Sequence, residues 1–150
     1  MSDKYPVLVQ LKNENNHEFR HQIIAELKRI SSEKEVNDFY DLLNQFKKEF
    51  IQDSYFYIDQ LNEVIKNLFY IDNINPQYIY KPLLFLSQIG DNNTLELIKK
   101  NIGLFAPYNK FYEELIQSCK ILENRLKRME EEADDYKLYP MTEIIDQWME

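Results

Sequence analysis

Two histidines and a glutamate near the start of this 150-residue chain have the spacing of a zinc-hydrolase motif. His17, Glu18 and His21 match H-E-x-x-H, in which two histidines bind zinc from one helix face and the glutamate activates the metal-bound water. A catalytic zinc ion needs a third protein ligand, and the sequence holds no third histidine to supply it. Arg20 would also place a cation within one turn of the metal. We therefore favour exposed histidines on an amphipathic helix and keep a zinc-dependent hydrolase as the less favoured alternative.

The other reactive residue types do not form a catalytic set. The single cysteine, Cys119, shares an apolar helical spacing with Leu115 and Leu122, which predicts a buried thiol. The two glycines, Gly90 and Gly103, stand alone, so the chain lacks a glycine-rich phosphate loop. We expect a protein that is not an enzyme and that uses no catalytic residue, metal or cofactor.

The charge of the chain is concentrated near its C-terminal end. The net charge is −8, and residues 130–150 hold eight acids against one base. In the stretch "ENRLKRMEEEADDYKLYP" the bases precede the acids along one expected helix, although the C-terminal end of a helix favours cations. An arrangement that opposes helix stability suggests a function, and tyrosine and tryptophan beside charge are common anchors in protein interfaces. The acidic balance argues against a nucleic-acid surface and for a basic protein partner.

The elements that must position these residues are helical after a short start. The opening "YPVLVQLKN" alternates between apolar and polar residues and predicts an extended arm over residues 1–14. From residue 15 onward apolar residues recur at helical spacing, and polar residues that could cap helices divide them. A last short helix is expected over about residues 142–149. The predicted caps are Asn15 with Glu18, Ser32 with Glu35, Asn75 with Pro76, and Asn93 with Glu96, and Asp53, Ser54 and Gly90 are the predicted breaks.

The predicted helices form pairs that begin near residues 17, 55 and 94, a period of about 38 or 39 residues. The stretch "LSQIGDNNTLELIKKNI" resembles the junction between successive HEAT repeats, where one helix ends at Gly-Asp and the next follows at once. The resemblance implies an all-α, HEAT-like stack of about three antiparallel helical hairpins in a single domain over residues 1–150. The extended arm would precede this stack, and the acidic segment of residues 130–150 with its short extra helix would end it.

A helical stack without catalytic residues suits a protein that binds other proteins. In size, charge and fold this chain resembles in type a bacterial immunity protein of a contact-dependent inhibition (polymorphic toxin) system, which implies an inhibitor that occludes the active site of a basic toxin such as a nuclease. A generic HEAT-like adaptor or regulatory subunit is the alternative. The chain shows no secretory signal and no long apolar run, so we expect a cytoplasmic protein without a membrane or nucleic-acid partner. The predicted partner-binding residues are Glu130, Glu131, Glu132, Asp134, Asp135, Tyr136 and Tyr139, with Asp53, Asp59 and Glu63 on the concave helical face as the next acids to test.

Overall fold

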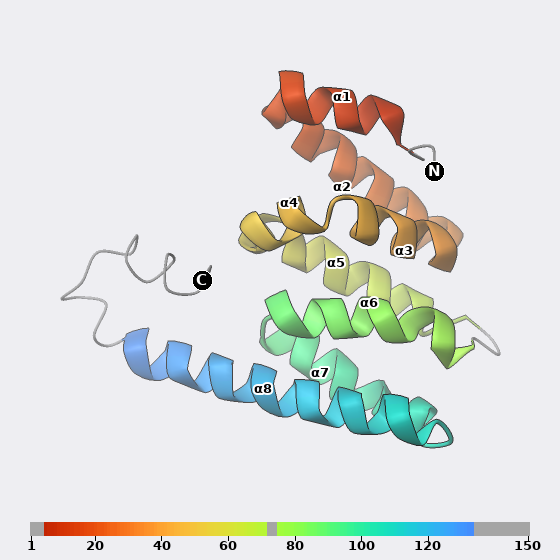
Figure 1. Ribbon diagram of the computed structural model, residues 1–150, viewed down its shortest axis with the longest axis vertical. Coiled ribbons are helices and arrows are strands. Elements are labelled where there is room, and N and C mark those ends of the chain that lie inside the picture. Colours follow the sequence, from red (N-terminus) through yellow and green to blue (C-terminus); the bar gives the residue numbers. More distant parts are fainter. Residues whose placement is uncertain (1–4, 72–74, 134–150) are drawn as a thin grey trace.

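The computed structural model describes residues 5–71 and 75–133, and this part of the chain is helical without a strand (Figure 1). The prediction of an all-α protein is therefore confirmed for the described residues. The helices are α1 (Pro6–Glu14), α2 (Asn16–Glu33), α3 (Val36–Gln45), α4 (Lys47–Gln52), α5 (Ser54–Leu68), α6 (Pro76–Ile89), α7 (Asn92–Asn101), the 3-10 helix η1 (Ile102–Phe105) and α8 (Asn109–Ala133). The short helix expected over residues 142–149 lies outside the described residues.

The helices lie in two layers (Figure 1). In one layer α2 contacts α5, and α5 contacts α7; in the other α3 contacts α6, and α6 contacts α8. Helix α1 packs against α2 at one end, and α8 forms the opposite end. One continuous cluster of apolar side chains fills the space between the layers, and the stripes predicted from helical spacing supply much of it. Its fully buried members include Phe19, Ile23, Leu27, Ile30, Leu61, Leu68, Ile79, Leu86, Leu115 and Leu122.

The predicted extended arm is wrong where the structure describes it, because Pro6–Glu14 form α1. Pro6 occupies the first turn of this helix, where its missing N–H removes no hydrogen bond. Tyr5, Leu8 and Val9 follow helical spacing and join the core, so packing against α2 favours the helix. The alternation of Val7 and Val9 misled the prediction, since Val7 is exposed.

Two of the predicted helix caps are confirmed. The Asn15 side chain accepts a hydrogen bond from the Glu18 amide at 3.1 Å and begins α2. The reciprocal bond is absent between these residues, because the Asn15 amide donates to the Leu11 carbonyl oxygen. At α6 the Asn75 side chain accepts from the Gln77 amide at 3.0 Å. Asp53 separates α4 from α5 and Gly90 ends α6, as predicted.

The other two predicted caps are wrong. Ser32 lies inside α2, which continues to Glu33 and ends at Lys34 in the left-handed conformation, with φ of 56°. Helix α7 begins two residues earlier than Asn93 and Glu96 suggested, because Asp91 is its N-cap. At α2 the left-handed backbone of Lys34 sets the end of the helix, and at α7 Asp91 and Thr94 form the capping box.

The junction between α6 and α7 is held by a buried polar network. The Asp91 side chain accepts from the Thr94 amide at 3.0 Å, while the Asp91 amide donates to Thr94 Oγ1 at 3.1 Å. Thr94 Oγ1 donates to Asn62 Oδ1 at 2.6 Å, and Asn62 Nδ2 donates to Asp91 Oδ1 at 3.0 Å. Because Asn62 belongs to α5, the cap of α7 also fixes α7 against its neighbour in the layer. From α8 the Arg125 guanidinium donates to the carbonyl oxygens of Gln88 and Gly90.

Among the helices that the structure describes, no segment combines the length and apolar character needed to cross a membrane.

Candidate functional site

The two histidines lie together on the exposed start of α2. Their Nε2 atoms are 3.2 Å apart, and the rings meet edge to face with centroids 4.5 Å apart. The helix geometry explains this contact, since residues four apart lie on the same helix face. The predicted exposure of both side chains is confirmed.

The full set of residues needed for a zinc hydrolase does not come together in the described part of the chain. No group of three or more histidine, cysteine, aspartate or glutamate side chains in residues 5–71 and 75–133 could hold a metal ion. The Glu18 carboxylate accepts a hydrogen bond from Gln22 at 3.0 Å along the helix. Arg20, which the sequence placed within a turn of the metal, turns toward α5 instead.

Cys119 lies in the core as predicted. Burial raises the pKa of its thiol, so the reactive thiolate is disfavoured. Its neighbours on the same face of α8 are the buried Leu115 and Leu122. Cys119 therefore has the environment of a packing residue.

The predicted acidic site begins at the end of α8, which extends past the ends of α6 and α7 (Figure 1). Glu130 and Glu131 are exposed there, and Glu132 is half-buried. Within the described residues neither Glu130 nor Glu131 forms an ion pair. Four other predicted site residues, Asp134, Asp135, Tyr136 and Tyr139, lie outside the described residues.

Asp53 occupies a different environment from the acids at the end of α8. Its carboxylate pairs with Arg20 at 3.0 Å, which joins the start of α5 to α2. The hydrogen bond from Arg20 to Asp53 raises the pKa of the guanidinium, and the Phe56 ring lies 5.4 Å from the same group. Asp53 therefore already has an internal partner.

Asp59 and Glu63 lie on α5 beside a surface hollow of about 440 Å³ between α5 and α7. Lys66 and Lys100 line the same hollow, so both signs of charge are present. Asp53 is not among its lining residues. The three acids that the sequence assigned to one concave face are thus divided between two places with different electrostatic surroundings.

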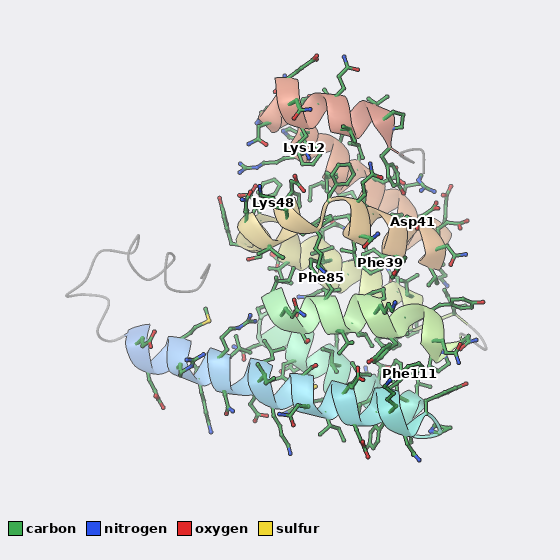
Figure 2. The ribbon with its side chains drawn as sticks, in the orientation of Figure 1. Lys12, Phe39, Asp41, Lys48, Phe85 and Phe111 are labelled. Atoms are coloured by element: carbon green, nitrogen blue, oxygen red, sulfur yellow. The ribbon has the colours of Figure 1, made fainter. Side chains whose placement is uncertain are left out.

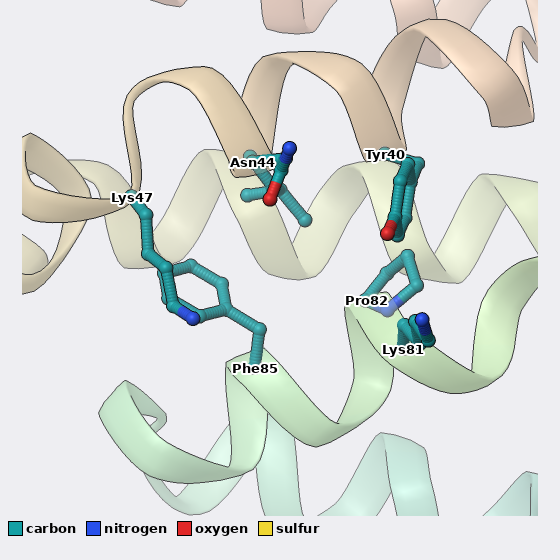
Figure 3. A pocket seen from close by; sticks show the side chains of 7 residues that line it. Tyr40, Asn44, Lys47, Lys81, Pro82 and Phe85 are labelled. Carbon is teal, nitrogen blue, oxygen red and sulfur yellow. The ribbon is translucent and has the colours of Figure 1, made fainter.

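A groove between α3 and α6 was missed at the sequence level. It has a volume of about 290 Å³ and is lined by Tyr40, Leu43, Asn44, Lys47, Lys81, Pro82 and Phe85 (Figure 3). Figure 3 shows the Lys47 side chain beside the Phe85 ring and Tyr40 directed toward Pro82. Lys81 Nζ lies 6.0 Å from the centre of the Tyr40 ring.

The floor of this groove continues into the core, because Leu43 and Phe85 line the groove and also belong to the apolar cluster. Phe39 is fully buried and lies with Phe85 between α3 and α6 (Figure 2). On the next helix pair the Tyr80 and Phe111 rings stack with centroids 4.1 Å apart, which joins α6 to α8. Tyr40 and Asn44 share one face of α3, but Lys47 belongs to α4, so helical spacing alone does not bring the three residues together.

The lining residues of the groove include two lysines and no acid. The net charge of the chain is −8, whereas both charged residues that line the groove are basic. Aromatic rings and lysine ammonium groups can receive a segment that carries carboxylates and apolar side chains.

Comparisons of the chain with protein-family models, with curated protein sequences and with solved structures found no match.

Proposed function

We propose that this protein is a binding protein of the immunity type, which inhibits a basic toxin such as a nuclease by covering its active site. The observation that carries the proposal is the acidic end of α8. Glu130 and Glu131 are exposed where the helix extends beyond the stack, and the sequence continues with Asp134 and Asp135. A partner with a cationic active site would meet this end of the molecule first.

The electrostatics of the helix end support a binding role. Acids in the last turn face the negative end of the helix dipole, which costs about 0.3–1 kcal/mol for each charge at low salt. A cationic partner would remove this repulsion, so the same charges that destabilise the free helix would stabilise the complex. Clustered surface charge also raises the association rate with an oppositely charged partner.

The layered helices fit a HEAT-like stack of three hairpins, which would pair α2 with α3, α5 with α6, and α7 with α8. The first helices of these pairs begin at Asn16, Ser54 and Asn92, which are evenly spaced along the chain. Each first helix contacts the first helix of the next pair, and each second helix does the same. Such stacks present long, rigid faces to protein partners.

The test is partner capture followed by measurement of the charge dependence of binding. The tagged protein is used to isolate a partner from its own cells, and the partner is identified by mass spectrometry. Affinity is then measured at low and high salt for the wild type and for a double variant, Glu130→Gln with Glu131→Gln. The matched control is Glu113→Gln with Glu114→Gln, which removes charge at the other end of the same helix.

We expect a partner rich in lysine and arginine, and a double variant that binds on the order of tenfold more weakly at low salt. The dependence of its affinity on salt should also be flatter, because fewer charges meet the partner. The control variant should bind as the wild type does. A neutral or acidic partner, or equal losses in both variants, would exclude the acidic end as the binding site.

The groove between α3 and α6 favours a second candidate function, that of an adaptor. The occupant would be an extended peptide segment of a partner that carries aspartate or glutamate beside apolar side chains. Lys47 and Lys81 would pair with its carboxylates, while Tyr40, Pro82 and Phe85 would contact its apolar groups. Affinity would then fall with Lys47→Glu and Lys81→Glu, whereas Lys34→Glu, at the exposed end of α2, would leave it unchanged.

A further inference from the structure

The contact between His17 and His21 is more specific than exposure on one helix face requires. Exposed imidazoles four residues apart can turn away from each other into water, but here the two Nε2 atoms approach to 3.2 Å. Two nitrogens at this distance can share one proton in a hydrogen bond, or both can point their lone pairs at one ion. These two possibilities differ in what they predict for metal binding.

The distance fits a shared metal ion. A zinc–imidazole nitrogen bond is about 2.0–2.1 Å long. Two such bonds at a tetrahedral angle separate the nitrogens by about 3.4 Å, and at a right angle by about 2.9 Å. The observed 3.2 Å lies between these values. We propose that His17 and His21 form a two-histidine chelate for a first-row transition-metal ion on the surface of α2.

The structure weakens the main objection that the sequence raises. Arg20 would oppose a cation if its guanidinium lay beside the histidines, but the group pairs with Asp53 at 3.0 Å and lies over the Phe56 ring. The carboxylate of Asp53 therefore balances the charge of Arg20 locally. The positive end of the α2 dipole still opposes the metal, at a cost of about 0.3–1 kcal/mol, which limits the affinity without preventing coordination.

Ligand chemistry sets which ions bind. Imidazole suits copper, nickel and zinc, whereas magnesium and calcium prefer oxygen ligands. Among divalent ions the expected order of affinity is Cu²⁺ above Ni²⁺ and Zn²⁺. Two protein ligands leave the remaining positions to water or to a donor from another molecule. The site is therefore distinct from a zinc-hydrolase centre, which needs a third ligand that the described residues do not provide.

The proposal does not depend on the partner-binding function, because His17 and His21 lie on α2, whereas α8 forms the opposite end of the fold. Its direct consequence is a metal-dependent gain in stability. An ion that binds the folded helix and not the unfolded chain stabilises the fold in proportion to the logarithm of its concentration. The gain should appear with Ni²⁺ or Zn²⁺ and be missing with Mg²⁺.

The test is titration calorimetry of the 150-residue protein with NiCl₂, ZnCl₂ and CuCl₂, together with thermal unfolding in the same salts and in MgCl₂. The informative variant moves one imidazole by one position, with His21→Gln and Gln22→His in the same chain. It keeps two histidines and the composition of the helix but removes the four-residue spacing. His17→Ala is the second variant, and circular dichroism confirms that each variant keeps its helices.

We expect one equivalent of Ni²⁺ or Zn²⁺ to bind the wild type, and both variants to bind at least tenfold more weakly. The metal-dependent rise in unfolding temperature should disappear in both. If the variant with the shifted histidine binds as tightly as the wild type, the ion is held by isolated imidazoles and the chelate is wrong. Binding that survives His17→Ala with unchanged affinity would place the metal elsewhere on the protein and would equally overturn the proposal.

Discussion

Replacing Gly90 by alanine tests the junction that fixes α6, α7 and α8 relative to one another. The backbone of Gly90 is extended, with φ of −76° and ψ of 170°, so alanine is compatible with its conformation. The obstacle is space: an added Cβ would lie 2.6 Å from Cβ and Cγ2 of Thr94 and 2.7 Å from the Leu86 carbonyl oxygen. Carbon atoms normally pack at about 3.5–4.0 Å, so Thr94 would have to retreat by roughly 1 Å.

The magnitude follows from two destabilising terms and one stabilising term. Overpacking of this kind costs about 1–3 kcal/mol, and displacement of Thr94 also weakens the α7 capping box, which is worth about 0.5–2 kcal/mol. Restricting the unfolded chain by Gly→Ala returns about 0.4–1 kcal/mol. We therefore expect Gly90→Ala to lower the free energy of unfolding by about 1–4 kcal/mol.

Gly103 is a matched control. An added Cβ there would meet nothing within 4 Å, and the residue lies in the 3-10 helix η1. Only the unfolded-state term acts, so Gly103→Ala should stabilise the protein by about 0.4–1 kcal/mol. The same substitution thus has opposite signs at the two glycines.

Urea unfolding followed by circular dichroism measures both free energies, and thermal melts should differ in the same direction by about 2–4 °C per kcal/mol. The reasoning fails if Gly90→Ala is as stable as the wild type. It also fails if Gly103→Ala loses as much stability as Gly90→Ala, because the effect would then not come from the packing at the junction.

Three further substitutions test other parts of the fold. Thr94→Val keeps the shape of the side chain but leaves the Asp91 amide and Asn62 Oδ1 without their bonds to Thr94 Oγ1, so urea unfolding should show a loss of about 1–3 kcal/mol. Arg125→Met removes the hydrogen bonds to the end of α6 and should lower the free energy of unfolding by about 1.5–3 kcal/mol, and Arg125→Lys should lower it less. An Arg125→Met variant as stable as the wild type would exclude this anchoring role. Burial, followed by the charge of a nearby carboxylate, raises the pKa of Tyr57 to about 12, so the folded state keeps the phenol proton that the unfolded chain releases near pH 10. This part of the stability is complete below pH 10 and is lost between pH 10 and 12. Because the Tyr57 hydroxyl is buried without a hydrogen-bond partner, Tyr57→Phe should be as stable as the wild type at pH 7. Between pH 10 and 12 the variant should lose less stability than the wild type.

Much of the fold could be predicted because the decisive patterns are local. Phe19, Ile23 and Leu27 are spaced so that one helix face is apolar, and all three are buried. Asn75 before Pro76 combines a cap with a residue that needs no hydrogen bond in the first turn, and the helix begins there. Such signals depend on residues within one or two turns, so they survive whatever the tertiary structure is.

The errors arise where two local patterns compete or where a distant contact decides. Residues Pro6–Glu14 show alternation and helical spacing at once, and contact with α2 decides for the helix. Ser32 had the composition of an N-cap, but the left-handed backbone of Lys34 places the end of α2 two residues later. Asp91 and Asn93 both have the composition of an N-cap for α7, and the capping box of Asp91 with Thr94, together with the bond from Asn62, decides for Asp91.

The candidate sites show the same contrast between features that local spacing predicts and features that depend on tertiary contacts. The spacing of His17 and His21 predicts that they share a helix face, but the approach of their Nε2 atoms depends on side-chain conformations. The groove could not be predicted, because Tyr40 and Lys81 belong to different helices and only the packing of α3 on α6 brings them together. Sequence spacing therefore finds sites within one helix and misses sites between helices.

The ion pairs of the described residues also indicate which acids a partner could use. Glu49 pairs with Lys12 at 3.1 Å and Asp53 with Arg20 at 3.0 Å, in each case between two helices. A partner that bound these acids would first have to break an internal contact, and that cost would reduce its affinity. Glu130 and Glu131 require no such exchange within the described part of the chain, and they lie where α8 has left the stack. Charge at the end of α8 should therefore affect association with a basic partner more strongly than an equal charge within the helical stack. The comparison of Glu130 and Glu131 with Glu113 and Glu114, on the same helix, tests this difference directly.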